Sequence, residues 1–90
     1  MTIEASLCVA FGQNIHVLSV KMIRIESTNY FFIRDKETET PLLGSRVLEL
    51  TYTDAFSLTE FSGVVKSPDI PGEIISVIQK ELMENQDLWF

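Results

Sequence analysis

The spacing of apolar residues changes once along this chain, from every second residue in the first two thirds to every third or fourth residue in the last third. The segment RVLELTYT at 46–53 alternates most clearly, with Leu48, Leu50 and Tyr52 on one side. Such alternation is typical of a strand with one buried face. Four other segments also have strand character, at 2–11, 15–26, 30–35 and 56–65. We therefore expect strands over roughly 2–66.

The last third of the chain has the periodicity of an amphipathic helix, predicted over roughly 70–86. Asp69 is the predicted N-cap and Pro71 lies in the predicted first turn, where these residue types favour helix initiation. When successive residues are placed 100° apart, the apolar residues of this segment fall within one arc. They are Ile74, Ile75, Val77, Ile78 and Leu82.

Together these elements predict a single α+β domain over 1–90, with an apolar tail at 87–90. Its predicted core is a curved antiparallel sheet of about five strands, arranged as a meander that is either open or barrel-like. The C-terminal amphipathic helix packs on this sheet. A chain of 90 residues buries only one thin core.

The first two strands raise a covering problem, because both of their faces carry apolar residues. We expect Phe11 to lie opposite Ile15 across a turn at 12–14, and the apolar phase of the second strand predicts a bulge near Met22. In that register Cys8 and His16 share one face. A single helix covers one face only, so the other must curl into a barrel or pack against a second copy of the chain.

Few residues suggest chemistry. Cys8 and His16 would be diagonal neighbours on the sheet, a spacing that admits a nucleophile–base pair, although a buried thiol and a structural histidine are the favoured interpretation. Asp35, Glu37 and Glu39 would share one side of an extended segment, but basic residues interleave with them and favour a solvated hairpin end. The sequence has no phosphate-binding glycine loop and no hydrolase motif. We therefore expect no catalytic residue, no metal and no cofactor.

The charge of the chain limits its partners. Its net charge of −6 repels phosphate backbones, so direct nucleic-acid binding is not expected. The single cysteine, Cys8, cannot form an intramolecular disulfide, and the acidic start of the chain differs from a secretory signal. No apolar run approaches the ~20 residues that span a bilayer. These observations predict a cytoplasmic protein without a membrane partner.

The chain ends in DLWF, which includes its only tryptophan. The simplest interpretation is that this segment extends the buried face of the helix or folds back over the sheet. The functional alternative is that Leu88, Trp89 and Phe90 bind a partner, since tryptophan is enriched at binding hot spots. A third alternative is exchange of tails between two copies.

These features predict a small non-enzymatic, intracellular protein-interaction module that forms a homodimer. An inhibitor or adaptor of phage or mobile-element type is one such protein. The alternative is a ligand-binding or catalytic barrel, with a pocket inside the curled sheet. We expect that pocket to be lined by Cys8, His16, Tyr30 and Tyr52.

Overall fold

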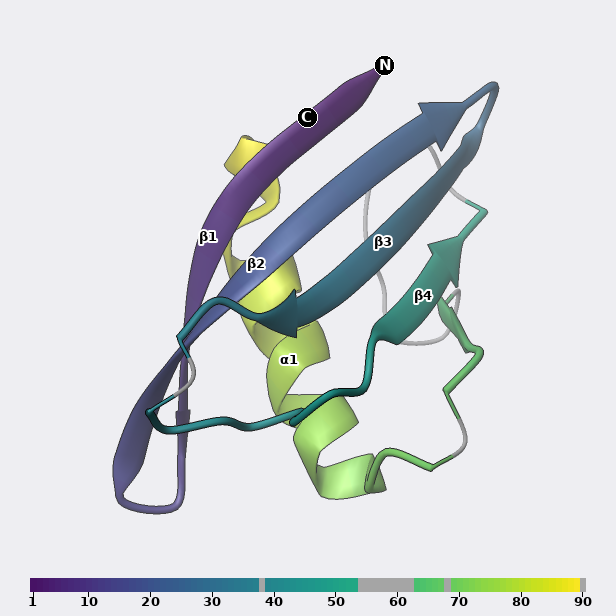
Figure 1. Ribbon diagram of the computed structural model, residues 1–90. Helices are drawn as coiled ribbons and strands as arrows, with labels where there is room; N and C mark the ends of the chain where they lie inside the picture. The colour runs from purple at the N-terminus through teal and green to yellow at the C-terminus, as the bar shows by residue number, and fades with distance from the viewer. Residues whose placement is uncertain (38, 54–62, 68, 90) are drawn as a thin grey trace.

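The computed structural model describes residues 1–37, 39–53, 63–67 and 69–89. Within these residues the chain forms one antiparallel sheet with a single α-helix packed on it, which confirms the predicted α+β class (Figure 1). The sheet is a meander in the order β1-β2-β3-β4-β5 and is open, not closed into a barrel. Its strands are β1 (Thr2–Phe11), β2 (Asn14–Ile25), β3 (Thr28–Asp35), β4 (Leu48–Tyr52) and β5 (Gly63–Val65). The part of the predicted fifth strand at 56–62 lies outside the described residues.

The β1–β2 hairpin turns through two residues, Gly12 and Gln13, and not through the three that the sequence suggested. Phe11 therefore pairs with Asn14 instead of Ile15. Gly12 has φ 65°, a conformation that glycine adopts without steric cost and that two-residue hairpins require. Because side chains alternate across a sheet, this one-residue difference reverses the face assigned to every residue of β2 relative to β1.

The predicted bulge near Met22 is also wrong. Pairing of β2 with β1 and with β3 continues without interruption through Met22. The apolar phase changes in the sequence because Ile23 and Ile25 lie on the outer face, away from the helix, and Ile25 is 59% exposed. The strand keeps its alternation and exposes apolar residues near its end.

With the observed register, the apolar core lies on one face of the sheet, which we call the inner face. Every strand from β1 to β4 alternates between this face and the opposite, outer face. The expected second apolar face is therefore not present as a continuous surface, because polar and charged residues interleave with the apolar ones there. The buried hydrophobic strand residues are Leu7, Val9, Leu18, Val20, Met22, Phe31, Ile33, Leu48, Leu50 and Tyr52.

The helix α1 (Gly72–Glu84) covers the inner face and buries Ile74, Ile78 and Leu82, all from the predicted apolar arc. It begins after Pro71, and no side chain caps its first turn. The prediction that Asp69 is the N-cap is wrong, because helical backbone starts two residues later than that cap requires. The α-helix is followed by a short 3-10 turn, η1 (Gln86–Leu88). No helix among the described residues is long and apolar enough to cross a membrane.

The segment between β3 and β4 is held by one carboxylate. Asp35, half-buried at the end of β3, accepts hydrogen bonds of 2.8–3.3 Å from the backbone amides of Leu42, Leu43 and Gly44. His16 Nδ1 donates to the carbonyl of Thr40 at 2.7 Å. These bonds place Leu42 and Leu43 in the core, so a stretch of irregular backbone closes the end of the sheet.

Replacing Asp35 by alanine should therefore destabilise the protein by about 2–3 kcal/mol, because amides of a buried loop segment lose a charged acceptor. Denaturant unfolding followed by circular dichroism measures this change. Glu37→Ala is the matched control, since Glu37 is an exposed acid two residues away and should have an effect within ~0.5 kcal/mol of zero. Equal effects of the two variants would contradict this role of Asp35.

Aromatic contacts organise the centre of the core. Phe31 and Tyr52 pack edge to face, with ring centroids 5.7 Å apart. Burial raises the pKa of the Tyr52 hydroxyl above its ordinary value. The side chain of Gln79 on α1 partly opposes this rise in pKa, although it makes no hydrogen bond of normal geometry to the hydroxyl.

The raised pKa of Tyr52 predicts a loss of stability at high pH. Below pH 10.0, the ordinary value, the phenol is neutral in both states, so this contribution is fully present. As the pH rises further, the unfolded state ionises first, and the free energy of unfolding should fall by up to about 1.4 kcal/mol per pH unit. Measurements of unfolding from pH 8 to 11.5 test this prediction. The fall in the free energy of unfolding above pH 10 should be smaller in Tyr52→Phe and unchanged in Tyr30→Phe.

Candidate functional site

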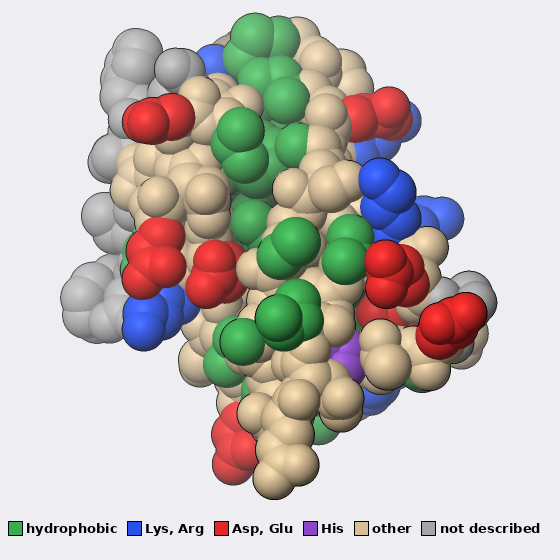
Figure 2. Space-filling view, turned by 90° about the vertical axis from the view of Figure 1, so that its left-hand side faces the viewer, with side chains coloured by type: hydrophobic (Ala, Val, Ile, Leu, Met, Phe, Trp, Pro, Cys, Tyr) green, Lys and Arg blue, Asp and Glu red, His purple; other side chains and the backbone are tan. Residues whose placement is uncertain are grey.

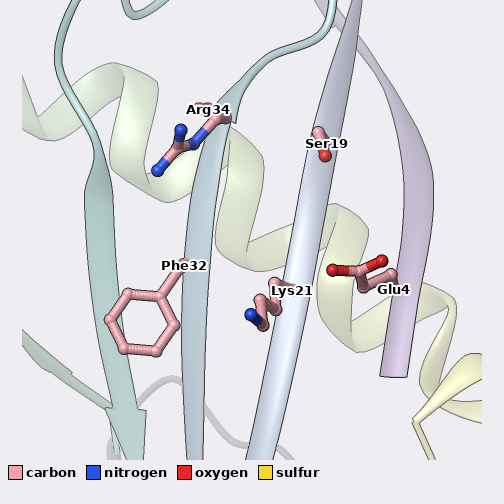
Figure 3. Close-up of a pocket in the computed structure, with 5 residues that line it drawn as sticks. All are labelled: Glu4, Ser19, Lys21, Phe32 and Arg34. Atoms are coloured by element: carbon pink, nitrogen blue, oxygen red, sulfur yellow. The ribbon is translucent and has the colours of Figure 1, made fainter. Parts of the chain in front are cut away.

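The outer face of the sheet carries a shallow depression of about 300 Å³. Its floor and walls come from three adjacent strands, with the helix on the far side of the sheet (Figure 3). Lys21 pairs directly with Phe32, and Ser19 with Arg34, so an aromatic ring lies beside two cations. Glu4 on β1 pairs with Lys21, and its side chain points toward β2 from the opposite side of the depression.

The cations of this depression have no bonded partner within the described part of the chain. Lys21 and Arg34 are exposed, and neither side chain makes an ion pair or a hydrogen bond there. Lys36, a cation of the outer face that does not line the depression, donates to Ser6 Oγ at 2.7 Å. Lys21 and Arg34 are therefore available to an external anion.

Charge is unevenly distributed between the two sides of the molecule. The helical side, α1 and η1, holds four acids and one base, namely Glu73, Glu81, Glu84, Asp87 and Lys80. The pairing of the strands places four bases and two acids on the outer face, namely Lys21, Arg34, Lys36, Lys66, Glu4 and Glu49. An acidic chain thus presents one face with a local excess of positive charge.

A second surface is the free edge of β1. This strand pairs only with β2 among the described residues. Met1 exchanges backbone hydrogen bonds with Arg24, and the two-residue turn closes on Phe11 and Asn14. In an antiparallel pair the hydrogen-bonded positions alternate, so odd-numbered residues of β1 bond to β2. The even-numbered residues direct their amide and carbonyl groups to the open edge; they are Thr2, Glu4, Ser6, Cys8 and Ala10.

Apolar side chains accompany this edge. Ile3, Ala5 and Phe11 pack against the core but stay partly exposed, and Met1 is 62% exposed. The view onto the side of the molecule where β1 lies shows hydrophobic side chains gathered in a vertical band, with charged side chains on both flanks (Figure 2). The edge therefore combines unpaired backbone groups with an apolar margin.

The tail residues proposed to bind a partner are placed differently from one another. Trp89 is 1% exposed and packs edge to face on Phe31, with ring centroids 5.3 Å apart. Arg24 Nη2 donates to the carbonyl of Trp89 at 2.8 Å, while its Nε donates to Asn29 Oδ1 at 2.7 Å. The simplest interpretation, a tail folded back into the core, is confirmed for Trp89. A partner would reach this side chain only after the tail left its position.

For the other two tail residues, Leu88 and Phe90, partner binding stays a prediction. Leu88 is 45% exposed, so its side chain is accessible at the surface. Phe90 lies outside the described residues. Among the described tail residues, Leu88 is therefore the side chain that a partner could contact without a rearrangement of the tail.

The proposed Cys8–His16 pair does not form. Cys8 lies on the outer face and is exposed, whereas His16 pairs with Val9 and is buried on the inner face. The expectation that the two residues share one face is wrong because the hairpin turn is one residue shorter than expected. Of the favoured interpretation, the structural histidine is confirmed by its bond to Thr40, whereas the thiol is exposed and not buried. Tyr30 and Tyr52 likewise lie on opposite faces, so these four residues do not line one pocket.

The carboxylates considered as metal ligands do not act together either. Asp35 is engaged with backbone amides, while Glu37 and Glu39 are exposed on the following loop.

The depression and the free edge were not found from the sequence. Lys21 lies on a different strand from Phe32 and Arg34, and only the β2–β3 register brings it beside them. The alternation of β3 did place Phe32 and Arg34 on the same side. Selecting them as a site would have required knowing which side faced the helix.

Comparison with protein-family models, with curated proteins and with solved structures finds no match to this chain. The function proposed below therefore depends on the geometry of the chain itself.

The burial of Trp89 predicts that the tail is part of the folded core. Trp89→Ala should reduce the free energy of unfolding by about 3–5 kcal/mol, the usual cost of truncating a buried aromatic residue. Leu88→Ala is the matched control and should cost less than about 1 kcal/mol, because that side chain is half exposed. Chemical denaturation of both variants provides the comparison, and an unchanged stability of Trp89→Ala would refute the core assignment.

Proposed function

We propose that this chain is a small, non-enzymatic protein-interaction module that works as an intracellular homodimer joined along the free edge of β1. The observation that carries the proposal is the unpaired row of amide and carbonyl groups on this strand. An exposed edge strand is a template for pairing with another chain, and many recognition modules bind by adding a strand. A second copy is the occupant that we assign to this edge.

The edge lacks the usual features that prevent such pairing. Proteins protect edges with proline, lysine, bulges, inward-pointing charges or very short strands. β1 is ten residues long, pairs without a bulge, and contains no proline and a single charged residue, Glu4. Its side chains on the inner face are all apolar, so pairing would not bury a charge there.

A two-fold axis at Ser6 gives a self-complementary pairing. Antiparallel pairing about this residue places Ser6 opposite its own copy and Glu4 opposite Cys8 of the second copy, so that the two Glu4 carboxylates do not face each other. On the inner face, Ile3 would pair with Val9 and Ala5 with Leu7. Cross-strand apolar pairs of this kind stabilise a sheet.

The size of the contact also fits a dimer. Ten residues of strand extend about 33 Å, close to the longest dimension of the molecule, 36 Å. If the helical layer behind β1 also takes part, the smallest extent of the molecule, 21 Å, gives an upper limit on the order of 700 Å² per partner, near the ~800 Å² that specific interfaces typically bury on each side.

The competing hypothesis was a ligand-binding or catalytic barrel. The pocket predicted for it does not form, because the sheet is open and the proposed lining residues lie on two faces. A cytoplasmic location and an inhibitor or adaptor role of phage or mobile-element type stay predictions. They are compatible with a dimeric interaction module, and no contact described here depends on them.

Light-scattering mass at several concentrations tests the dimer, with Ser6→Pro and Ser6→Ala as a matched pair. Proline removes the Ser6 amide, which points to the open edge and is not used by β2, and it is tolerated on edge strands. Alanine keeps that amide and removes only the hydroxyl. We expect the wild type and Ser6→Ala to be dimers and Ser6→Pro to be a folded monomer.

Disulfide trapping provides a measurement that does not require a destabilising variant. In a Cys8→Ser background, Ser6→Cys should form a covalent dimer on mild oxidation, because directly opposed residues have Cα atoms about 5.5 Å apart, within disulfide range. Ser19→Cys in the same background is the control, since the two β2 strands would lie about 14 Å apart. A monomeric wild type without cross-linking at position 6 would overturn the proposal.

A further inference from the structure

We propose that the depression on the outer face binds a short acidic segment of a partner protein, with Lys21 and Arg34 holding a carboxylate above the ring of Phe32. This inference concerns a different surface from the β1 edge. It does not require the dimer, because all of the residues involved come from one chain.

The positions of the two cations suit one carboxylate. Lys21 is directly opposite Phe32, and Arg34 lies two residues further along the same strand as Phe32. Lys21 and Arg34 are therefore diagonal neighbours, about 7–8 Å apart with their Cβ atoms somewhat closer. Both side chains are long enough to converge on a group between them, and a guanidinium can bind a carboxylate through two parallel hydrogen bonds.

The remaining residues of the depression favour a peptide side chain over a free ion. Phe32 is half-buried and offers an apolar surface beside the cations, as seen in Figure 3. The hydroxyl of Ser19, opposite Arg34, is a further donor within the same depression. A volume of about 300 Å³ accommodates a carboxylate together with an adjacent apolar group.

Charge complementarity indicates an acidic partner, and the two flanking carboxylates limit how many negative charges the bound segment can carry. Glu4 and Glu49 lie in the same cross-strand row as Lys21 and Phe32, one on each side of this pair. A phosphodiester backbone crossing the sheet would pass these carboxylates, and the chain as a whole repels it at a net charge of −6. A segment with one or two carboxylates can enter between them. The observations therefore favour an acidic peptide over a nucleic acid.

Titration of the full-length protein with the peptide acetyl-NLDFE-amide, which carries two carboxylates, followed by amide NMR shifts at low ionic strength, tests the site. Its uncharged analogue acetyl-NLNFQ-amide is the control ligand. We expect the acidic peptide to shift the resonances of Lys21, Phe32 and Arg34, with at least tenfold tighter binding than the analogue. Raising the salt concentration should weaken this binding, because exposed ion pairs are screened.

Lys21→Gln and Arg34→Gln should each weaken binding of the acidic peptide at least fivefold. Lys80→Gln is the matched control, since it removes one positive charge from the exposed helical side and should leave the affinity within twofold. The amide spectrum of each variant verifies its fold. The dimer experiments above are independent of this result, so failure of one proposal can be distinguished from failure of the other.

Several outcomes would overturn the inference. Equal binding of the two peptides would show that the carboxylates are not recognised, and equal losses in all three variants would show that only net charge matters. Tighter binding of oligothymidine dT12 at the same residues would assign the face to single-stranded nucleic acid instead. No shift with either peptide at millimolar concentration would leave the depression without this function.

Discussion

The two-residue turn at Gly12 and Gln13 is the constraint on which the rest of the structure depends. It sets Phe11 opposite Asn14, and every other pair between β1 and β2 follows from that register. A shift of one residue would exchange the inner and outer faces of a strand. The turn therefore determines that His16 enters the core while Cys8 stays outside. It also determines which amides of β1 bond to β2 and which point to the open edge.

Segments from both ends of the chain complete the core on the inner face. α1 covers the middle of the sheet, and Trp89 fills the space against Phe31 that the helix does not reach. Arg24 connects these parts, because its backbone pairs with Met1 while its side chain bonds to Asn29 and to the carbonyl of Trp89. A domain of this size has a folding stability of only about 5–10 kcal/mol. Burial of one tryptophan is therefore a large contribution to the stability of this fold.

The elements of the fold could be predicted from local patterns, whereas the site could not. The alternation at Leu48, Leu50 and Tyr52 and the helical arc around Ile78 were sufficient for the class and order of the elements. The face of each β2 residue depended on whether the turn contained two or three residues, which Gly12-Gln13-Asn14 left open. The phase change at Ile23 was interpreted as a bulge because exposed isoleucines were not anticipated. The depression required the relative register of three strands, and no local pattern contains that information.

The two proposed surfaces are geometrically compatible, because pairing along β1 would extend each sheet without covering its outer face. Two-fold symmetry about Ser6 would place both outer faces on the same side of one continuous sheet. The Lys21 strands of the two copies would then lie about 14 Å apart, since three strand spacings of ~4.8 Å separate them. A partner with two acidic segments joined by a short linker could contact both depressions, and the second contact would form at a high effective concentration. Weak binding at one shallow depression would thereby become useful affinity, which gives a dimer of such a small module a functional reason beyond its stability.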